Sequence, residues 1–204
     1  GATLTTWNGG TIDKFNGGSV GSWISGTINE LLTGTIDLLD TGNLIKKMSG
    51  GTVTSMIGGE ITTIDNGLVK SITGGLVDTI NGGTINNLAG GTVNTMTAGK
   101  IGTASGGNIL EMSGGEIDKL TLTNITDLNG GLIKNVDGGN ITNMTNGRIN
   151  TMSATTIATV SGGTIDNMNT GSLISGMLGG TIAKMNDGEI TALTGGEVTL
   201  FING

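Results

Sequence analysis

The chain has 204 residues and a formal net charge of −7 at pH 7, and it contains 41 glycines but no proline, cysteine or histidine. The lack of cysteine excludes disulfide bonds and thiolate chemistry, and the excess of acidic residues argues against a nucleic-acid-binding surface, which needs Lys and Arg to neutralise phosphates. No run of eighteen apolar residues is present, so the sequence predicts no membrane span.

One pattern, G-G-x-[IVL]-x-x-[LMIVFW]-x, repeats about twenty-five times from the first residues to the last. It predicts a single repeat domain over residues 1–204, which we expect to be a fragment or shaft of a longer protein. Each unit is predicted to form one short strand at its first apolar position, and these positions step by eight residues with two single insertions. In chain order they are Leu4, Ile12, Val20, Ile28, Ile36, Leu44, Ile45, Val53, Ile61, Val69, Val77, Ile85, Val93, Ile101, Ile109, Ile117, Ile125, Ile133, Ile141, Ile149, Ile157, Ile165, Leu173, Ile174, Ile182, Ile190 and Val198.

A second apolar residue follows three positions after the first, and all nine methionines fall there. Methionine fills irregular space well, so we expect these side chains in the core. Trp7, Phe15 and Trp23 occupy this position in three successive units, which predicts one complete turn of a three-sided helix with a widened or capped end. Carbohydrate stacking by these aromatic rings would require them to leave the core.

A double glycine in every unit excludes a helix, because each glycine inside a helix costs about 1 kcal/mol relative to alanine. The glycines instead suit corners with positive φ between short extended segments. Residues three apart on a flat strand face opposite sides, so we expect the bend between strands to turn the second apolar residue back inward. The sequence therefore predicts an all-β fold, a β-solenoid.

Two windings fit this repeat. One chain could wind alone with three units per turn, which would make residues i and i+24 neighbours, or three identical chains could intertwine. Thr123 and Thr155, which replace the usual glycine, and the leucines Leu68, Leu76 and Leu132 show no recurrence at a spacing of three units. The sequence therefore favours an intertwined homotrimer over a single-chain β-helix.

The unit pattern, seen for example in Gly162, Gly163, Ile165 and Met168, resembles that of the triple-stranded β-helices of phage tail fibres and tail spikes. This resemblance covers the whole chain in period and composition. It implies a structural shaft of a phage-like appendage involved in host contact, located on a virion or outside the cell. It also implies that flanking domains bind a host cell-surface polysaccharide. A bacterial adhesin or matrix fibre is an alternative.

The sequence offers little for catalysis, because it lacks histidine, cysteine and tyrosine and has a single arginine, Arg148. We therefore predict that the chain is not an enzyme, with no catalytic, cofactor-binding or metal-binding residues and no cofactor. Carboxylates beside the first apolar position are expected to be solvated, with calcium binding as a minor alternative. They are Asp13, Asp37, Glu60, Asp78, Glu116, Asp118, Asp166, Glu189 and Glu197.

Threonines in the position before the first apolar residue suggest another alternative, an ice-binding solenoid. Such a face needs a regular array, and Glu60, Leu68, Leu76, Lys100, Glu116, Leu132 and Arg148 interrupt it. The threonines are Thr3, Thr11, Thr27, Thr35, Thr52, Thr84, Thr92, Thr156, Thr164 and Thr181.

Overall fold

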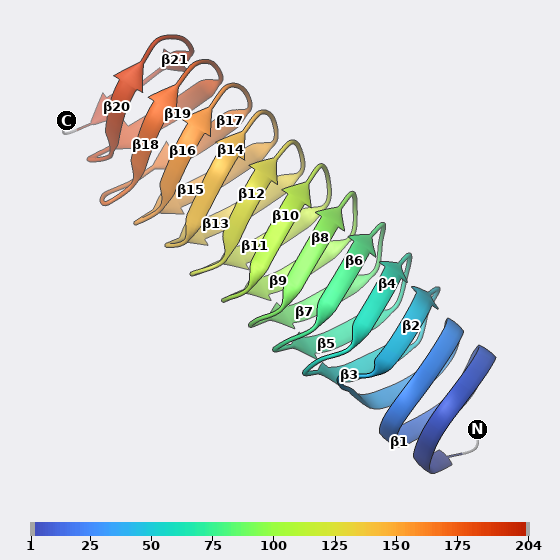
Figure 1. Cartoon of the computed structure of the whole chain (residues 1–204). Coiled ribbons are helices and arrows are strands. Elements are labelled where there is room, and N and C mark those ends of the chain that lie inside the picture. The colour runs from blue at the N-terminus through green and yellow to red at the C-terminus, as the bar shows by residue number, and fades with distance from the viewer. Residues whose placement is uncertain (1–2, 203–204) are drawn as a thin grey trace.

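The computed structural model describes residues 3–202, which form a parallel β-solenoid of about eleven turns. Figure 1 shows an elongated body with the two termini at opposite ends and two stacked rows of strands that face each other. All the regular elements in residues 3–202 are strands, so this part of the chain contains no helix that could cross a membrane. The all-β prediction is confirmed.

The strands alternate between the two rows. The first strand, β1 (Thr3–Leu39), is continuous and winds through both rows at the N-terminal end. The front row in Figure 1 contains the even-numbered strands β2 (Asn43–Met48), β4 (Glu60–Ile64), β6 (Leu76–Ile80), β8 (Thr92–Met96), β10 (Asn108–Met112), β12 (Asn124–Leu128), β14 (Asn140–Met144), β16 (Thr156–Val160), β18 (Leu173–Met177) and β20 (Glu189–Leu193). The other row contains β3 (Thr52–Met56), β5 (Leu68–Ile72), β7 (Thr84–Leu88), β9 (Lys100–Ala104), β11 (Glu116–Leu120), β13 (Leu132–Asp137), β15 (Arg148–Ser153), β17 (Thr164–Met168), β19 (Thr181–Asn186), β21 (Glu197–Val198) and β22 (Phe201–Ile202).

From β2 to β19 the strands pair in parallel with neighbours one turn away, which from β4 to β18 are the strands two before and two after in the same chain. At the ends, the long β1 pairs with both β2 and β3, and β19 pairs with both β21 and β22. The register joins residues 16 apart, as for Thr92 and Asn108, and 17 apart across the insertions, as for Thr156 and Leu173. The three-unit spacing predicted for a single chain is therefore wrong, because one turn contains two units. The ladders of the described residues close within one chain, and the intertwined homotrimer stays a prediction.

The core is a double column of apolar side chains between the two rows. Both apolar positions of a unit are buried in the same five-residue strand, for example Ile117 and Leu120 in β11, which are fully shielded from solvent. Asp118 and Lys119, the two residues between them, both face outward. The reversal of side-chain direction thus occurs inside the strand, not at the bend between strands as predicted.

The second apolar position is a core position, as predicted from its methionines. Eight methionines are completely buried and Met185 is 5% exposed. At the N-terminal end Trp7 and Trp23 stack with their ring centroids 4.8 Å apart, one turn from each other. Trp23 and Phe15 are buried, and the partly buried Trp7 packs against the core. Because Trp7 and Trp23 are one turn apart, the predicted three-sided turn is wrong, and the rings belong to the core.

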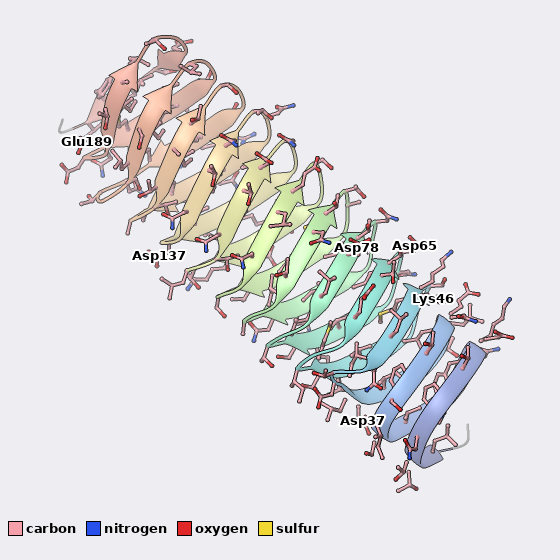
Figure 2. All side chains as sticks on the ribbon, in the orientation of Figure 1. Asp37, Lys46, Asp65, Asp78, Asp137 and Glu189 are labelled. Carbon is pink, nitrogen blue, oxygen red and sulfur yellow. The ribbon has the colours of Figure 1, made fainter. Side chains whose placement is uncertain are left out.

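The corners form two long edges that differ in regularity. We call one the glycine edge, because each of its corners ends in a glycine with φ between +69° and +100°. It contains residues 49–51, 65–67, 81–83, 97–99, 113–115, 129–131, 145–147, 161–163, 178–180 and 194–196. We call the other the variable edge, which contains residues 40–43, 57–59, 73–75, 89–91, 105–107, 121–123, 138–139, 154–155, 169–172 and 187–188. In Figure 2, Asp65 marks the glycine edge, and Asp137 and Glu189 lie along the variable edge.

Candidate functional site

Polar side chains on the outer surface form ladders with the same side-chain position one turn away. Asparagine donates its side-chain amide to an aspartate sixteen residues earlier at several places, with distances of 2.7 Å to 3.1 Å. The pairs are Asn29 with Asp13, Asn81 with Asp65, Asn94 with Asp78, and Asn143 with Asp127. This recurrence at sixteen residues is a signal in the sequence that could have identified the turn length.

The predicted outward position of the carboxylates holds, but several of them have polar partners one turn away. Arg148 donates from Nε to both oxygens of Asp166 and places its Nη2 2.7 Å from Oδ2. Within residues 3–202, no three Asp or Glu side chains are grouped closely enough to hold a metal ion. The carboxylates therefore act as hydrogen-bond acceptors for polar side chains one turn away.

Four charged side chains on neighbouring strands β9, β11 and β13 form one ion cluster. Lys100 Nζ lies 3.0 Å from Glu116 Oε1 and 2.7 Å from Asp118 Oδ2, and Lys134 Nζ lies 2.8 Å from Glu116 Oε1 and Asp118 Oδ1. Each lysine thus bridges both carboxylates. The cluster joins three successive turns of one face, and its charges cancel in pairs.

The hydrogen bonds from Lys100 and Lys134 lower the pKa of Asp118 to about 2. Glu116 also has a lowered pKa, chiefly through its hydrogen bonds from Lys134 and Lys100, and the pKa values of both lysines are raised by the carboxylates. All four groups remain charged at neutral pH, so none is poised to transfer a proton. We interpret the cluster as a surface brace.

Replacing Lys134 with methionine (Lys134→Met) is expected to raise the pKa of Asp118 from about 2 towards its ordinary value of 3.8. Because the folded-state pKa is lowered, the stability from this group is present above pH 4 and is lost as pH falls from about 4 to about 2. Carboxyl carbon NMR during an acid titration measures the shift. Lys184→Met, on β19, is the control, and an unchanged midpoint for Asp118 in Lys134→Met would contradict the cluster.

The threonine positions proposed for ice binding do not form a continuous array on either face. On the even strands, the position before the first apolar residue reads Thr92, Asn108, Asn124, Asn140 and Thr156 along successive turns. Asn140 donates to Asn124, and Asn124 donates to Asn108, at 3.2 Å and 3.3 Å. On the odd strands, charged residues and leucine separate the threonines. The surface at these positions is a mixed polar ladder.

The variable edge collects the irregular corners of the repeat. Thr123 and Thr155, which replace the usual glycine, are both fully buried, and the residues before them, Leu122 and Ala154, adopt φ of +57° and +47°. Thr123 Oγ1 donates to the Gly106 carbonyl oxygen at 3.1 Å, one turn earlier. The two threonines lie two turns apart on the same edge. The replacements of glycine, which show no recurrence at a spacing of three units, therefore recur at a spacing of four units.

Both single insertions also lie on the variable edge, where each one adds a tight turn. The backbone N–H of Asn43 donates to the Asp40 carbonyl oxygen, and that of Ser172 donates to the Asn169 carbonyl oxygen, both at 3.1 Å. The inserted residues point inward, since Asn43 and Ser172 are each only 2% exposed. Sequence reasoning located the insertions but missed that they share one edge.

A surface groove accompanies each inserted turn. The first, of about 400 Å³, is lined by Thr41, Gly42, Asn43, Leu44, Gly59, Glu60 and Leu76. The second, of about 430 Å³, is lined by Gly171, Ser172, Leu173, Asp187, Gly188 and Glu189. Glu60 lines the first groove, Asp187 and Glu189 line the second, and the lining residues offer no arrangement of nucleophile and base.

Searches of known protein families, characterised proteins and solved structures gave no match to this chain.

Proposed function

We propose that this chain is a structural shaft, a stiff segment of a phage-like tail fibre, spike or similar appendage on a virion or outside the cell. The unbroken parallel ladder is the observation that supports this proposal most directly. Every turn hydrogen-bonds to the next through main-chain groups from β1 to β22. Bending such a rod requires many of these bonds to deform together, so the fold resists bending. In this proposal the chain has no enzymatic activity and needs no cofactor.

The length of the rod follows from its pitch. Neighbouring strands in a sheet are about 4.8 Å apart, so about eleven turns span roughly 50 Å. A longer polypeptide with further turns would extend the rod in proportion. In this proposal, contact with a host polysaccharide is made by other parts of that polypeptide, as the resemblance to tail fibres implies.

The intertwined trimer, which the sequence favoured, needs ladders between chains. The structure offers a simpler arrangement, because the ladders from β1 to β22 close within one chain. A homotrimer of this solenoid would instead have to form by packing of complete rods side by side. The shaft proposal holds for one rod or for three.

We expect the purified chain to elute as an elongated particle, and light scattering coupled to size exclusion to give either one or three times the chain mass of 20.3 kDa. Small-angle scattering should give a rod profile in both cases, because the ladder determines the length. A compact, roughly spherical particle would contradict the shaft, whatever its mass.

A bacterial adhesin or matrix fibre would share the same rod, and a binding assay separates it from a passive shaft. Labelled chain incubated with bacterial envelopes and purified surface polysaccharides should remain unbound if it is a shaft alone. Saturable binding would favour an adhesin.

The interrupted threonine ladders predict that the chain does not bind ice and therefore shows no thermal hysteresis. A measurable difference between the melting point and the freezing point of its solution would contradict that prediction.

A further inference from the structure

The two grooves of the variable edge share a sequence motif. Residues 40–45 read DTGNLI and residues 169–174 read NTGSLI, each with the inserted residue in the fourth place. One turn later, the same face carries GEIT in both cases, at residues 59–62 and 188–191. The register places Leu44 beside Glu60 and Leu173 beside Glu189. The same combination of inserted turn, leucine and glutamate therefore occurs twice, eight turns apart.

Buried polar atoms at both insertions lack a hydrogen-bond donor or acceptor. Asn43 donates from Nδ2 to the Trp23 carbonyl oxygen at 2.8 Å, but its buried Oδ1 has no partner. Ser172 Oγ is likewise buried without a partner. Within residues 3–202, only three buried side-chain atoms are in this state, and two of them belong to residues that line these grooves. Both atoms are shielded from solvent and lie beneath the grooves, so they mark the inserted turns as departures from the regular corner and are not themselves ligand contacts.

The side chains that line the first groove include one carboxylate, Glu60, and two leucines, Leu44 and Leu76. Glu60 stands in the ladder between Leu44 and Leu76, and its recorded partner is Thr62 Oγ1, which donates at 3.1 Å. Leu44 and Leu76 are both partly exposed there. A carboxylate between two leucine side chains suits a cation that carries an aliphatic stem.

The second groove has the same character with an additional carboxylate. Asp187, which adopts φ of +60°, accepts a hydrogen bond from Thr170 Oγ1 at 3.3 Å, and Glu189 follows two residues later. Among the described residues, neither groove is lined by Lys or Arg, so these carboxylates carry no bound cation of the chain itself. The net charge of −7 further favours a positively charged ligand.

We propose that each groove binds the primary ammonium group of a lysine side chain from a partner protein. The ammonium would donate to the Glu60 or Glu189 carboxylate, and the methylene stem would lie along Leu44 and Leu76 or along Leu173. A calcium ion fits less well, since it requires six to eight oxygen ligands and gains nothing from leucine walls. The proposal goes beyond a passive shaft, because it gives one edge of the rod two equivalent attachment points.

The test is a two-dimensional amide NMR titration of the full chain with Nα-acetyl-lysine methylamide. We expect saturable shifts at residues 42–44 and 59–60 and at residues 171–173 and 188–189, in the millimolar range. Nα-acetyl-norleucine methylamide, which has an aliphatic stem without the ammonium group, is the matched control ligand and should leave these signals in place. Equal shifts with both ligands, or saturable shifts with calcium chloride alone, would overturn the proposal.

Variants separate the two sites from each other. Glu60→Gln should weaken binding at the first groove at least about tenfold and leave the second unchanged, and Glu189→Gln should do the reverse, since a hydrogen bond to a charged group is lost. Glu197→Gln changes the same unit position on β21, outside the grooves, and should have no effect. Deletion of Asn43 restores a regular corner and should remove the first site only. If binding in the first groove survived both Glu60→Gln and the deletion, the proposal would fail, while the rod measured by scattering would stand.

Discussion

A double variant with cysteines in place of Thr79 and Thr95 is expected to close a disulfide bond within one chain under mild oxidation. The two residues are direct neighbours in the register of β6 and β8, and both are partly exposed. Neighbouring strands lie about 4.8 Å apart, within the range of Cα separations of 4.4 to 6.8 Å that a disulfide bond accepts. The natural sequence has no cysteine, so no other pairing competes. The closed loop should stabilise the fold by about 3 kcal/mol.

The control pairs Thr79→Cys with Thr103→Cys, which are three units apart in the sequence and lie on opposite rows, in β6 and β9. That variant should remain reduced within the chain. Non-reducing gels and intact mass measure both outcomes. Cross-linked dimers or trimers from the first variant would support intertwined chains, and ready closure of the control pair would support three units per turn.

Replacing Gly115 with alanine is expected to destabilise the solenoid by about 3 kcal/mol. Gly115 closes a corner of the glycine edge with φ of +80°, where a side chain is strained. An added Cβ would also lie 2.6 Å from Met96 Cε and 2.8 Å from the Gly99 carbonyl oxygen of the turn below. The methionine can move, but the stacked backbone cannot move without breaking the ladder.

Gly42→Ala is the matched control, because Gly42 has φ of +86° but no atom within 4 Å of the added Cβ. It should lose only the strain energy of a left-handed backbone, about 1 kcal/mol. Urea denaturation followed by circular dichroism compares the two variants. Equal losses would show that the glycine serves only to permit positive φ, and that close stacking of the corners contributes nothing.

Local features of the fold were predictable from the sequence because each depends on a few adjacent residues. Alternation of glycine corners with β-branched residues predicts short strands, and burial of Ile117 and Leu120 follows the two apolar positions of their unit. The expectation that methionines fill the core is confirmed for the same reason. The prediction that the side-chain direction reverses at the bend was wrong, and this error also has a local cause. It assumed the strict alternation of a flat strand, in which two consecutive residues such as Asp118 and Lys119 cannot both face outward.

Only part of each candidate groove could be predicted from the sequence. The insertions near Leu44 and Leu173 were visible in the sequence, whereas the placement of Glu60 beside Leu44 depends on the turn length. Once sixteen residues per turn are known, Thr123 and Thr155, and also Leu44 and Leu76, prove to lie two turns apart on one side of the rod. The recurrence of asparagine sixteen residues after aspartate carried the same information.

The sequence by itself determined that this chain forms strands, corners and a continuous apolar core, because propensity and burial act over a few residues. Only the tertiary structure decided that two corners close a turn. The angle through which each corner turns the chain sets that number, and two-cornered and three-cornered windings place the same glycines at corners and the same apolar residues inside. The winding then decided which side chains meet. With two units per turn, residues two units apart lie side by side and form the ion cluster and both grooves, whereas with three units per turn these residues would not be in contact.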